Sequence, residues 1–350
     1  MNFQETVSNW YRQNKRDLPW RGTNDAYVIW LSEIIMQQTR VEQGLPYFNR
    51  FLSAFPTVQD FAQASETEVL NLWQGLGYYS RGRNMLYTAK EVLRLHHGVF
   101  PTDYSTLLTL KGVGSYTAAA ISSFSSGAQH AVVDGNVFRL LARYFGIDIP
   151  INGTAGKKYF GDLAQELIQG QDASVYNQAI MEFGALQCKP KSPVCASCPL
   201  QLDCYARKNN LVDSLPVKLK AAAKRIRHLN YFVCTDGDLL LVNKRTQADV
   251  WQHLYDFPSI ETERGVDLTD TGLVGQVQEQ FGKAVTISML SNMKHVLTHQ
   301  IIYVQFFALD NYIINFNKTV DYKWVSWEDL EHLPQSKVIS SFLTGYLTKY

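Results

Sequence analysis

The spacing of hydrophobic residues changes once along this chain of 350 residues. Up to about residue 205, apolar residues recur every three or four positions, which is the period of an amphipathic helix. Gly and Pro residues separate the segments that show this period. Helices are therefore predicted at residues 27–38, 66–73, 116–124 and 137–144. This pattern predicts an all-helical domain over residues 1–206.

Beyond about residue 229 the pattern becomes that of an α+β domain. Residues 231–234 and 239–243 are rich in β-formers and flank Thr235-Asp236-Gly237-Asp238, a sequence typical of a hairpin turn. Residues 300–309 form another β-rich run, and residues 325–333 and 338–347 have helical spacing. A chain of this length normally divides into two domains. We therefore expect a smaller α+β domain over residues 229–350.

The segment between the two domains, residues 207–228, is far more basic than either of them. The formal net charge of the whole chain is only +1, so the overall charge neither favours nor excludes a polyanionic partner. The segment has one acidic residue, Asp213, and its basic residues are Arg207, Lys208, Lys218, Lys220, Lys224, Arg225 and Arg227. We interpret it as a linker that lies near an anionic partner, or else as a solvated connector.

Four of the five cysteines form the compact pattern Cys188-x6-Cys195-x2-Cys198-x5-Cys204. The N-terminus lacks the features of an export signal, and no apolar run approaches the roughly 18 residues of a membrane span. We therefore expect a cytoplasmic protein with no membrane association, in which clustered cysteines bind metal rather than form disulfides. Structural zinc sites usually pair two C-x2-C units, and only one is present. The uneven spacing suits an iron–sulfur cluster better, with zinc as the alternative.

Two further segments carry residues suited to DNA chemistry. Gly112-Val113-Gly114 precedes a helix of small residues, where backbone amides can hold a phosphate, although a tight turn between helices has the same sequence. Asp134 stands before a predicted helix and is first of all an N-cap residue. A carboxylate at a helix N-terminus is stabilised as the anion, and such a group can face a developing cation on a sugar.

Taken together, these motifs resemble those of a known enzyme family. Leu-x-Gly-Val-Gly-x-x-Thr-Ala over residues 110–118 resembles the helix–hairpin–helix motif, which grips the DNA backbone without reading sequence. With Asp134 and the cysteine pattern, it makes residues 1–205 resemble the endonuclease III superfamily of DNA glycosylases. The resemblance implies DNA contacts at Gly112, Val113 and Gly114. It also implies a 4Fe–4S cluster bound by Cys188, Cys195, Cys198 and Cys204.

Within this superfamily, Tyr116 and Glu33 indicate the reaction. Tyr116 stands where the glycosylase/lyase members have the lysine that forms a Schiff base, so strand cleavage is not expected. Trp30-Leu31-Ser32-Glu33, followed by Gln37-Gln38-Thr39, resembles the signature of the adenine DNA glycosylases of the MutY family. The resemblance implies that Glu33 protonates the adenine, and its apolar neighbours should raise its pKa. The alternative is an ordinary helical Glu facing solvent.

Other residues of the helical domain match the same family. Arg16, Trp20 and Arg21 resemble its adenine-pocket segment, and Gln38 and Tyr78 resemble side chains that enter the DNA stack beside the mispair. By the same resemblance, Tyr116 and Asn136 position the groups around Asp134. Each also has a simpler interpretation: core packing for the aromatic residues and a polar helix face for Gln38.

The C-terminal domain resembles the Nudix-like domain of that family. A Nudix hydrolase needs several carboxylates on one helix to bind Mg²⁺, but residues 274–282 contain only Glu279. We therefore expect recognition of 8-oxoguanine rather than hydrolysis. Leu297-Thr298-His299 occupies the place of the recognition loop, which in the family usually reads Phe-Ser-His, or it is a plain strand edge.

The sequence as a whole predicts a monofunctional DNA glycosylase of base excision repair that removes adenine paired with 8-oxoguanine or guanine. Its partner is double-stranded DNA, and we expect a monomer acting at the bacterial nucleoid. One alternative is a glycosylase/lyase that acts on oxidised pyrimidines. The other is a non-catalytic iron–sulfur module that binds DNA, although phosphate binding alone needs neither Glu33 nor Asp134.

Overall fold

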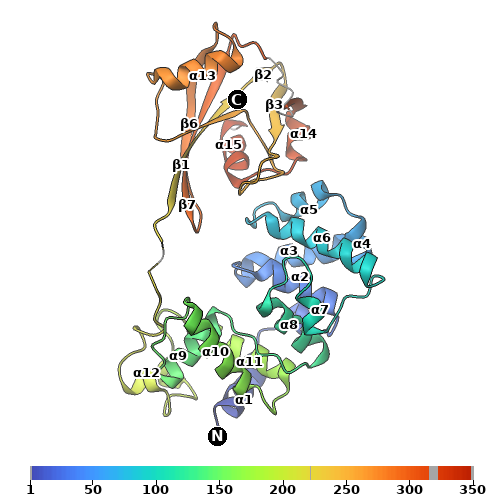
Figure 1. Ribbon diagram of the computed structural model, residues 1–350, viewed down its shortest axis with the longest axis vertical. Helices are drawn as coiled ribbons and strands as arrows, with labels where there is room; N and C mark the ends of the chain where they lie inside the picture. Colours follow the sequence, from blue (N-terminus) through green and yellow to red (C-terminus); the bar gives the residue numbers. More distant parts are fainter. Residues whose placement is uncertain (1, 221, 315–321, 348–350) are drawn as a thin grey trace. The chain divides into compact units, whose positions relative to one another are not determined.

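The computed structural model describes residues 2–220, 222–314 and 322–347. The chain forms two compact units (Figure 1). Residues 1–63 and 84–220 form the helical unit, and residues 64–83 together with 221–350 form the C-terminal unit. No helix among the described residues is both long and apolar enough to cross a membrane.

The helical unit is built from short helices joined by tight turns, as the apolar spacing predicts. Its helices are α1 (Phe3–Asn14), η1 (Pro19–Arg21), α2 (Ala26–Met36), α3 (Val41–Ala54), α4 (Val58–Gln63), the larger part of α6 (Ser80–Leu95), α7 (Tyr104–Leu107), α8 (Ser115–Ser126), α9 (Gly135–Phe145), α10 (Thr154–Leu167), α11 (Ala173–Leu186), η2 (Cys195–Ser197) and α12 (Tyr205–Lys208). The helices predicted at residues 27–38, 116–124 and 137–144 are confirmed as α2, α8 and α9.

Helix α2 lies deep in the helical unit because its sequence, AYVIWLSEIIM, is apolar on almost every side. Trp30 is 1% exposed, and its ring lies 5.0 Å from that of Phe100 and 5.9 Å from that of Phe61. A second apolar cluster forms where α1, α9 and α11 pack together, around Phe183 and Leu141. The two helices that carry Glu33 and Asp134, α2 and α9, are thus both fixed by core packing.

The described residues of the C-terminal unit form two four-stranded sheets. One has the order β5-β1-β7-β6, in which β1 runs parallel to β7 and its other pairs are antiparallel; the other has the order β2-β3-β4, with β8 paired to β3. The strands are β1 (Arg225–Val233), β2 (Thr235–Asp236), β3 (Leu239–Lys244), β4 (Tyr255–Asp256), β5 (Ser259–Thr262), β6 (Thr286–Val296), β7 (Gln300–Asp310) and β8 (Tyr322–Ser326).

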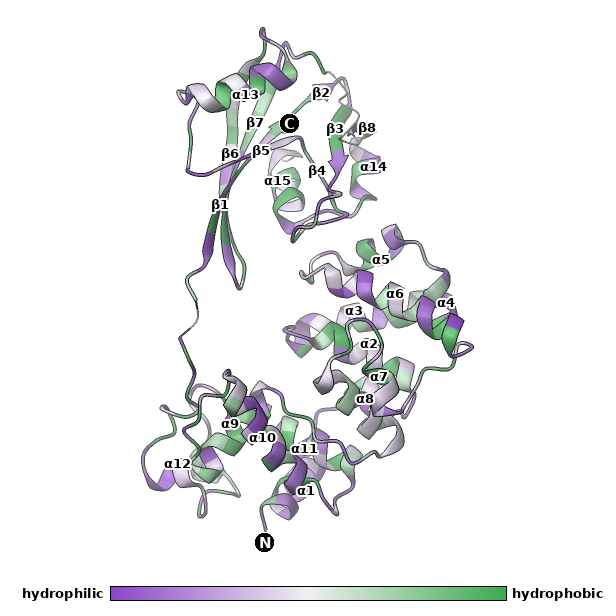
Figure 2. Ribbon diagram, in the orientation of Figure 1, coloured by the Kyte–Doolittle hydropathy of each residue, from purple (hydrophilic) through white to green (hydrophobic). Residues whose placement is uncertain are grey.

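Helices α13 (Thr271–Phe281) and α15 (Lys337–Leu347) cover the sheet formed by β5, β1, β7 and β6. Phe281 of α13 packs against Phe232 of β1, while Phe342 of α15 stacks at 4.0 Å on Phe306 of β7. Phe306 and the next residue of β7, Phe307, point to opposite sides because successive side chains of a strand alternate. The Phe232 ring stacks on that of Phe307 at 5.8 Å, so α13 lies on the Phe307 side of the sheet and α15 on the Phe306 side. Figure 2 shows apolar residues along β6 and β7 beside α13.

Most predicted elements of this unit are confirmed, and one is partly wrong. The strands predicted at residues 231–234, 239–243 and 300–309 correspond to β1, which ends at Val233, and to β3 and β7. The helix predicted at residues 338–347 is confirmed as the last helix, Lys337–Leu347, and β2 pairs with β3 around the predicted turn. The helix predicted at residues 325–333 is wrong at both ends, because its first two residues continue β8 and the helix ends at Glu331. Ser326 then caps α14 (Trp327–Glu331) by accepting a hydrogen bond from the Asp329 amide. Strand β6 was not predicted.

Residues 64–83 are held by polar contacts to the rest of the C-terminal unit. This segment contains α5 (Glu66–Trp73), whose predicted bounds are confirmed. The Asn71 side chain donates to the His332 carbonyl at 2.6 Å, and the Tyr79 hydroxyl donates to the Gln335 carbonyl at 2.8 Å. The predicted linker, residues 207–228, begins within α12 and ends within β1, so the connection between these two elements spans residues 209–224.

Two glycines of α10 provide a test of how the helical unit is packed. A Cβ atom on Gly156 would lie 2.1 Å from the Pro150 carbonyl oxygen, whereas one on Gly161 would meet nothing within 4 Å. We expect Gly161→Ala to stabilise the protein by about 0.5–1 kcal/mol through helix propensity. Gly156→Ala should destabilise it by about 1–3 kcal/mol, because backbone must move. Urea unfolding measures both, and effects of the same sign would contradict the packing described.

Candidate active site

A cavity of 540 Å³ in the helical unit gathers most of the residues that the sequence singles out for catalysis and adenine binding. Its walls come from η1, the C-terminal half of α2, the start of α8, the start of α9 and the end of α11. The predicted residues that line it are Arg16, Trp20, Arg21, Glu33, Gln38, Tyr116, Asp134 and Asn136. Residues far apart in sequence are thus brought to one cavity.

Glu33 is a buried carboxyl at this cavity. It lies on α2 and is only 9% exposed. Burial raises its pKa to about 7. The negative charge of Asp134 adds to this increase, and a hydrogen bond from Tyr116 partly offsets it. The sequence-based expectation of a raised Glu33 pKa is confirmed. Near neutral pH, this side chain can therefore hold a proton and give it to a bound molecule.

Asp134 is the N-cap of α9 and accepts several hydrogen bonds. The Asn136 and Val137 amides donate to its Oδ1, both at 2.8 Å, and the Asn136 side chain donates to its Oδ2 at 2.6 Å. Burial raises the Asp134 pKa, against the lowering effect of these donors. The sequence predicts only the stabilising effect of the helix N-terminus, and burial at the cavity works against it. Three donors still favour the anionic form at neutral pH.

The segment that leads into Asp134 is fixed by one buried amide, Asn177 of α11. Its Oδ1 accepts from the Val132 amide at 3.0 Å, and its Nδ2 donates to the His130 carbonyl at 2.8 Å and to Ser123 Oγ at 3.0 Å. Asn177 is 1% exposed. These hydrogen bonds hold the residues before α9 against α8, so the position of Asp134 depends on three helices.

Sequence reasoning missed Glu182, which also lines the cavity. Arg16 Nη2 and Arg21 Nη2 each donate to Glu182 Oε2 at 2.7 Å, and further bonds from both residues reach Oε1. Burial alone would raise the pKa of Glu182, but these hydrogen bonds lower it to about 2. The available signal was indirect: two arginines in a segment predicted to line a pocket need a carboxylate partner.

Trp20 and Gln38 both lie at the cavity wall. Trp20 is half-buried, and its ring packs edge-on against Phe48 at 5.0 Å, so it takes part in packing as well as lining the cavity. Gln38 follows α2 with a positive φ of 57°. Residues other than glycine rarely adopt such a conformation, and it is commonest at functional sites.

The predicted phosphate-binding hairpin lies between α7 and α8. Gly112 has φ of +82°, and a Cβ atom there would lie 3.2 Å from Asn84 Cβ, so both backbone and space require glycine. Gly114 is the N-cap of α8, and a Cβ atom there would meet nothing within 4 Å, which leaves the helix N-terminus open to approach. Val113 is 6% exposed, so its side chain packs inward. None of the three lines the catalytic cavity.

The four clustered cysteines share a separate small cavity with an apolar wall. Among the described residues, no three His, Cys, Asp or Glu side chains converge closely enough to hold a single metal ion. Arg143 of α9 donates to Cys188 Sγ at 3.4 Å, and Arg139 of α9 donates to the Cys188 carbonyl at 2.7 Å. Four soft thiol ligands around one cavity are a donor set that fits an iron–sulfur cluster. The fifth cysteine, Cys234, is buried in the C-terminal unit.

The predicted recognition residues lie in the C-terminal unit, at a cavity of 420 Å³. Leu297, Thr298 and His299 form the turn between β6 and β7 and line this cavity together with Tyr78. The Tyr78 and Thr298 hydroxyls are hydrogen-bonded to each other. Tyr78 has φ of +50° and is 40% exposed, so it is not the core residue of the simpler interpretation.

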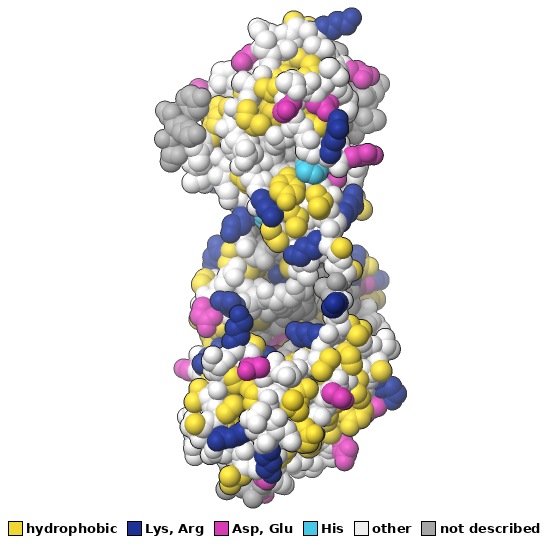
Figure 3. Space-filling model, turned by 90° about the vertical axis from the view of Figure 1, so that its left-hand side faces the viewer, with side chains coloured by type: hydrophobic (Ala, Val, Ile, Leu, Met, Phe, Trp, Pro, Cys, Tyr) yellow, Lys and Arg dark blue, Asp and Glu magenta, His cyan; other side chains and the backbone are white. Residues whose placement is uncertain are grey.

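On the face drawn in Figure 3, exposed lysines and arginines lie on both units. Hydrophobic side chains and a histidine are grouped on the C-terminal unit in the same view. Ile226 and Val296 are more than half exposed, and Val296 directly precedes the turn at 297–299. A surface of this kind allows backbone contacts with DNA at several points.

The helical fold, the hairpin and the cavity lined by the carboxyl groups of Glu33, Asp134 and Glu182 define a DNA-repair glycosylase of the helix–hairpin–helix class. Residues 31–154 match the HhH-GPD superfamily of base excision DNA repair proteins, and residues 230–345 match the NUDIX domain. The chain is 30% identical to the adenine DNA glycosylase of Buchnera aphidicola subsp. Baizongia pistaciae, over 99% of this chain and 96% of that protein. It belongs to the adenine DNA glycosylase family.

Two more relatives extend the comparison. The adenine DNA glycosylase of Rattus norvegicus is 30% identical over 98% of this chain and 78% of its own length. A solved thermostable thymine-DNA glycosylase has 28% sequence identity and a TM-score of 0.55, and covers 59% of this chain and 95% of that one. The structural similarity thus covers little more than half of the chain, whereas the adenine glycosylase relatives match nearly all of it.

The raised pKa of Glu33 predicts a pH-dependent effect on stability. A carboxyl whose folded pKa of about 7 exceeds its unfolded value favours folding at low pH, and this contribution is lost as the pH rises through about 7. We therefore expect Glu33→Gln to stabilise the protein by up to about 3 kcal/mol at pH 8 and by less than about 1 kcal/mol at pH 5. Urea unfolding at both pH values measures this, with the exposed Glu166→Gln as control. A gain that is equal at both values would contradict the assignment.

Proposed function

We propose that this protein is a monofunctional glycosylase that removes adenine paired with 8-oxoguanine or guanine in double-stranded DNA. The observation that carries the proposal is the pair of carboxyl groups in one cavity: Glu33 with a pKa raised to about 7, and Asp134 held by three donors. Two carboxyl groups in different environments can act as acid and as charge stabiliser in glycoside hydrolysis. Family membership supports adenine as the base.

The two carboxyl groups divide the reaction between them. Glu33 gives its proton to a ring nitrogen of the flipped adenine, which then leaves with the electron pair of the glycosidic bond. The Asp134 carboxylate stabilises the oxocarbenium-like sugar directly or as a transient adduct. Water then bonds to C1′, and its proton returns to the Glu33 carboxylate. Tyr116 orients the Glu33 carboxyl through its hydrogen bond, and Asn136 orients Asp134.

Adenine binding needs planar and charged partners in the same cavity. Trp20 offers an aromatic face or edge, and Arg16 and Arg21 are held rigid by Glu182. The cavity of 540 Å³ is within the range of small-molecule pockets. None of the described residues that line it is a lysine, which supports hydrolysis without a Schiff base. Strand cleavage by this protein is therefore not part of the proposal.

The duplex is held through contacts to its backbone and to its bases. Backbone amides around Gly112–Gly114 bind a phosphate, and Gln38 and Tyr78 enter the base stack beside the extruded adenine. Leu297, Thr298 and His299 read the opposite 8-oxoguanine, with the Thr298 hydroxyl as a polar contact in place of the usual serine. We propose that one copy of the chain acts on one duplex, and that in the cell this occurs at the bacterial nucleoid.

Cys188, Cys195, Cys198 and Cys204 would hold a 4Fe–4S cluster. Such a cluster would hold this loop in its folded form and would supply no group that reacts with the base. Arg139 and Arg143 connect this loop to α9, the helix that Asp134 caps. The cluster would therefore contribute to the position of Asp134 through the polypeptide.

The activity can be tested on a duplex with one adenine opposite 8-oxoguanine. We expect strand breaks only after alkali treatment, because the enzyme leaves an abasic site and an intact strand. Glu33→Gln should lower the single-turnover rate by at least about 100-fold, since a general acid contributes that much or more. Duplex binding should change little.

The controls for this assay separate the rival functions. Glu166→Gln, an exposed substitution of the same chemistry, should keep full activity. Breaks without alkali, with adducts trapped by borohydride, would identify a glycosylase/lyase instead. No product at all with retained duplex binding would leave a non-catalytic DNA-binding protein. Full activity in Glu33→Gln would remove Glu33 from the mechanism.

The cluster can be tested by iron and acid-labile sulfide analysis of the purified protein. Cys198→Ala should lower both, because a ligand is lost. Cys234→Ala, which removes a cysteine distant in sequence and buried among strands, should retain both. Zinc in place of iron and sulfide would contradict the proposed cofactor, as would equal iron contents in the two variants.

A further inference from the structure

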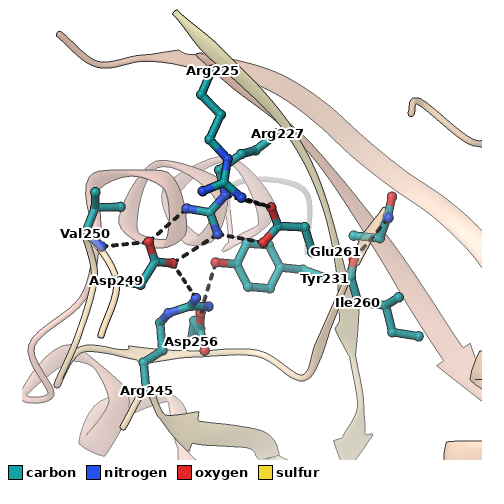
Figure 4. A network of polar contacts seen from close by, with 10 residues as sticks. Arg225, Arg227, Tyr231, Arg245, Asp249, Val250, Asp256, Ile260 and Glu261 are labelled. Carbon is teal, nitrogen blue, oxygen red and sulfur yellow. Dashed lines mark hydrogen bonds and ion pairs between the residues drawn. The ribbon is translucent and has the colours of Figure 1, made fainter. Parts of the chain in front are cut away.

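A network of charged side chains, most of them largely buried, lies beside the cavity of the C-terminal unit. It consists of Arg227, Arg245, Asp249, Asp256 and Glu261, and we call it the Arg227 network. Figure 4 shows Arg227 between Glu261 and Asp249, with Arg245 reaching both Asp249 and Asp256. Arg227 and Glu261 come from β1 and β5 of one sheet, and Asp256 comes from β4 of the other. The network therefore joins the two sheets.

Arg227 uses its whole guanidinium group in this network. It donates to Glu261 Oε1 and Oε2 at 2.8 and 2.6 Å, and to Asp249 Oδ1 and Oδ2 at 2.8 and 3.1 Å. Two bidentate contacts fix an arginine in orientation as well as in distance. Arg227 is 7% exposed, so water screens these contacts little.

Asp249 is the member of the network that reaches the cavity. Asp249, Val250 and Trp251 are consecutive residues of the loop between β3 and β4, and all three line the cavity that holds Tyr78 and the turn at 297–299. The loop is closed at its base, because Arg245 donates its amide to the Leu254 carbonyl at 3.0 Å. Asp249 also accepts from Arg245 at 2.7 Å and from the Val250 amide at 2.7 Å.

The same loop contacts the two segments of this unit that we propose bind DNA, namely the segment that carries Tyr78 and the strand that leads into the turn at 297–299. The Trp251 ring lies 5.8 Å from that of His295, on the strand that leads into the turn at 297–299. Arg83, which follows Tyr78 at the start of α6, donates to the Gln252 carbonyl at 2.6 Å. Moving Asp249 would therefore move a wall that supports both segments.

Stability alone does not account for these buried charges. Replacing a buried ion-pair network by apolar residues is often neutral or stabilising, whereas such networks can fix one arrangement among several. In this unit the network fixes the positions of three residues that line the cavity, Asp249, Val250 and Trp251. We propose that Arg227 is a positioning residue for recognition of the base opposite the adenine, and that it acts by holding Asp249 and thereby the Asp249–Trp251 wall.

This inference rests on the proposed function, since it concerns how 8-oxoguanine is told from guanine. Arg227 does not touch the cavity and is not in the catalytic site. Its substitution should therefore change which duplex is preferred, and not the rate at which bound adenine is released.

The test uses the full-length protein with Arg227→Lys, which keeps the charge but cannot form two bidentate contacts. Duplex affinities are measured in the Glu33→Gln background, and single-turnover rates at saturating enzyme with Glu33 intact. We expect the preference for 8-oxoguanine over guanine to fall about 10-fold or more, as small misplacements in a site cost up to about 100-fold. The single-turnover rate should stay unchanged. Arg264→Lys, an exposed arginine of the same unit, is the matched control.

A second measurement separates local displacement from unfolding. Amide hydrogen exchange in Arg227→Lys should become faster at residues 249–252 and remain unchanged in α13. If Arg227→Lys does not fold, Glu261→Gln takes its place, because it removes one of the two anions that hold Arg227 and does not line the cavity.

The possible results distinguish the role of Arg227 from the proposed reading of 8-oxoguanine. An unchanged preference in a folded variant would overturn the role of Arg227, and so would an equal loss of affinity for both duplexes. A protein with intact Arg227 that shows no preference for 8-oxoguanine would instead overturn the proposed reading of that base. Loss of preference with an unchanged rate supports both.

Discussion

The active site depends on the burial of one ionisable group within an apolar helix. Helix α2 is surrounded by core on nearly every side, and Glu33 is the only acidic residue in its sequence. Keeping a carboxylate in such surroundings costs free energy, so the group holds its proton up to about pH 7. An exposed glutamate would have lost its proton well below that pH and could not act as an acid. The core packing that stabilises the helical unit thus also creates a carboxyl group suited to the proposed role of acid.

Three carboxyl groups of one cavity differ because their neighbours differ. Glu33 has apolar surroundings and one hydroxyl partner, so its pKa rises. Glu182 has two arginine partners, so its pKa falls to about 2 despite burial. Asp134 lies between these cases, with burial opposed by the donors at the start of α9. The three groups are all carboxyl groups, and their pKa values differ because of burial, the donors at the start of α9 and the arginine partners.

The sequence predicted those features that are written in local patterns. The buried carboxyl of Glu33 and the capping carboxylate of Asp134 could be predicted because each lies within a short motif. The bounds of α5 could be predicted because Ser65 and Glu68 form a capping box. Glu182 could not be found, since its partners Arg16 and Arg21 are more than 160 residues away in sequence. For the same reason, no local pattern tells that residues 64–83 pack with the C-terminal unit.

The C-terminal unit shows how carboxylates in a Nudix-like fold can serve a purpose other than binding metal. Asp249, Asp256 and Glu261 all accept hydrogen bonds from arginines of their own chain. A carboxylate held in this way is already neutralised, so it contributes geometry rather than affinity for a cation. The helix that would carry metal ligands in a hydrolase, α13, instead packs Leu273, Val277 and Phe281 into the core. The ion pairs therefore hold the Asp249–Trp251 loop at the cavity, while α13 contributes to the core.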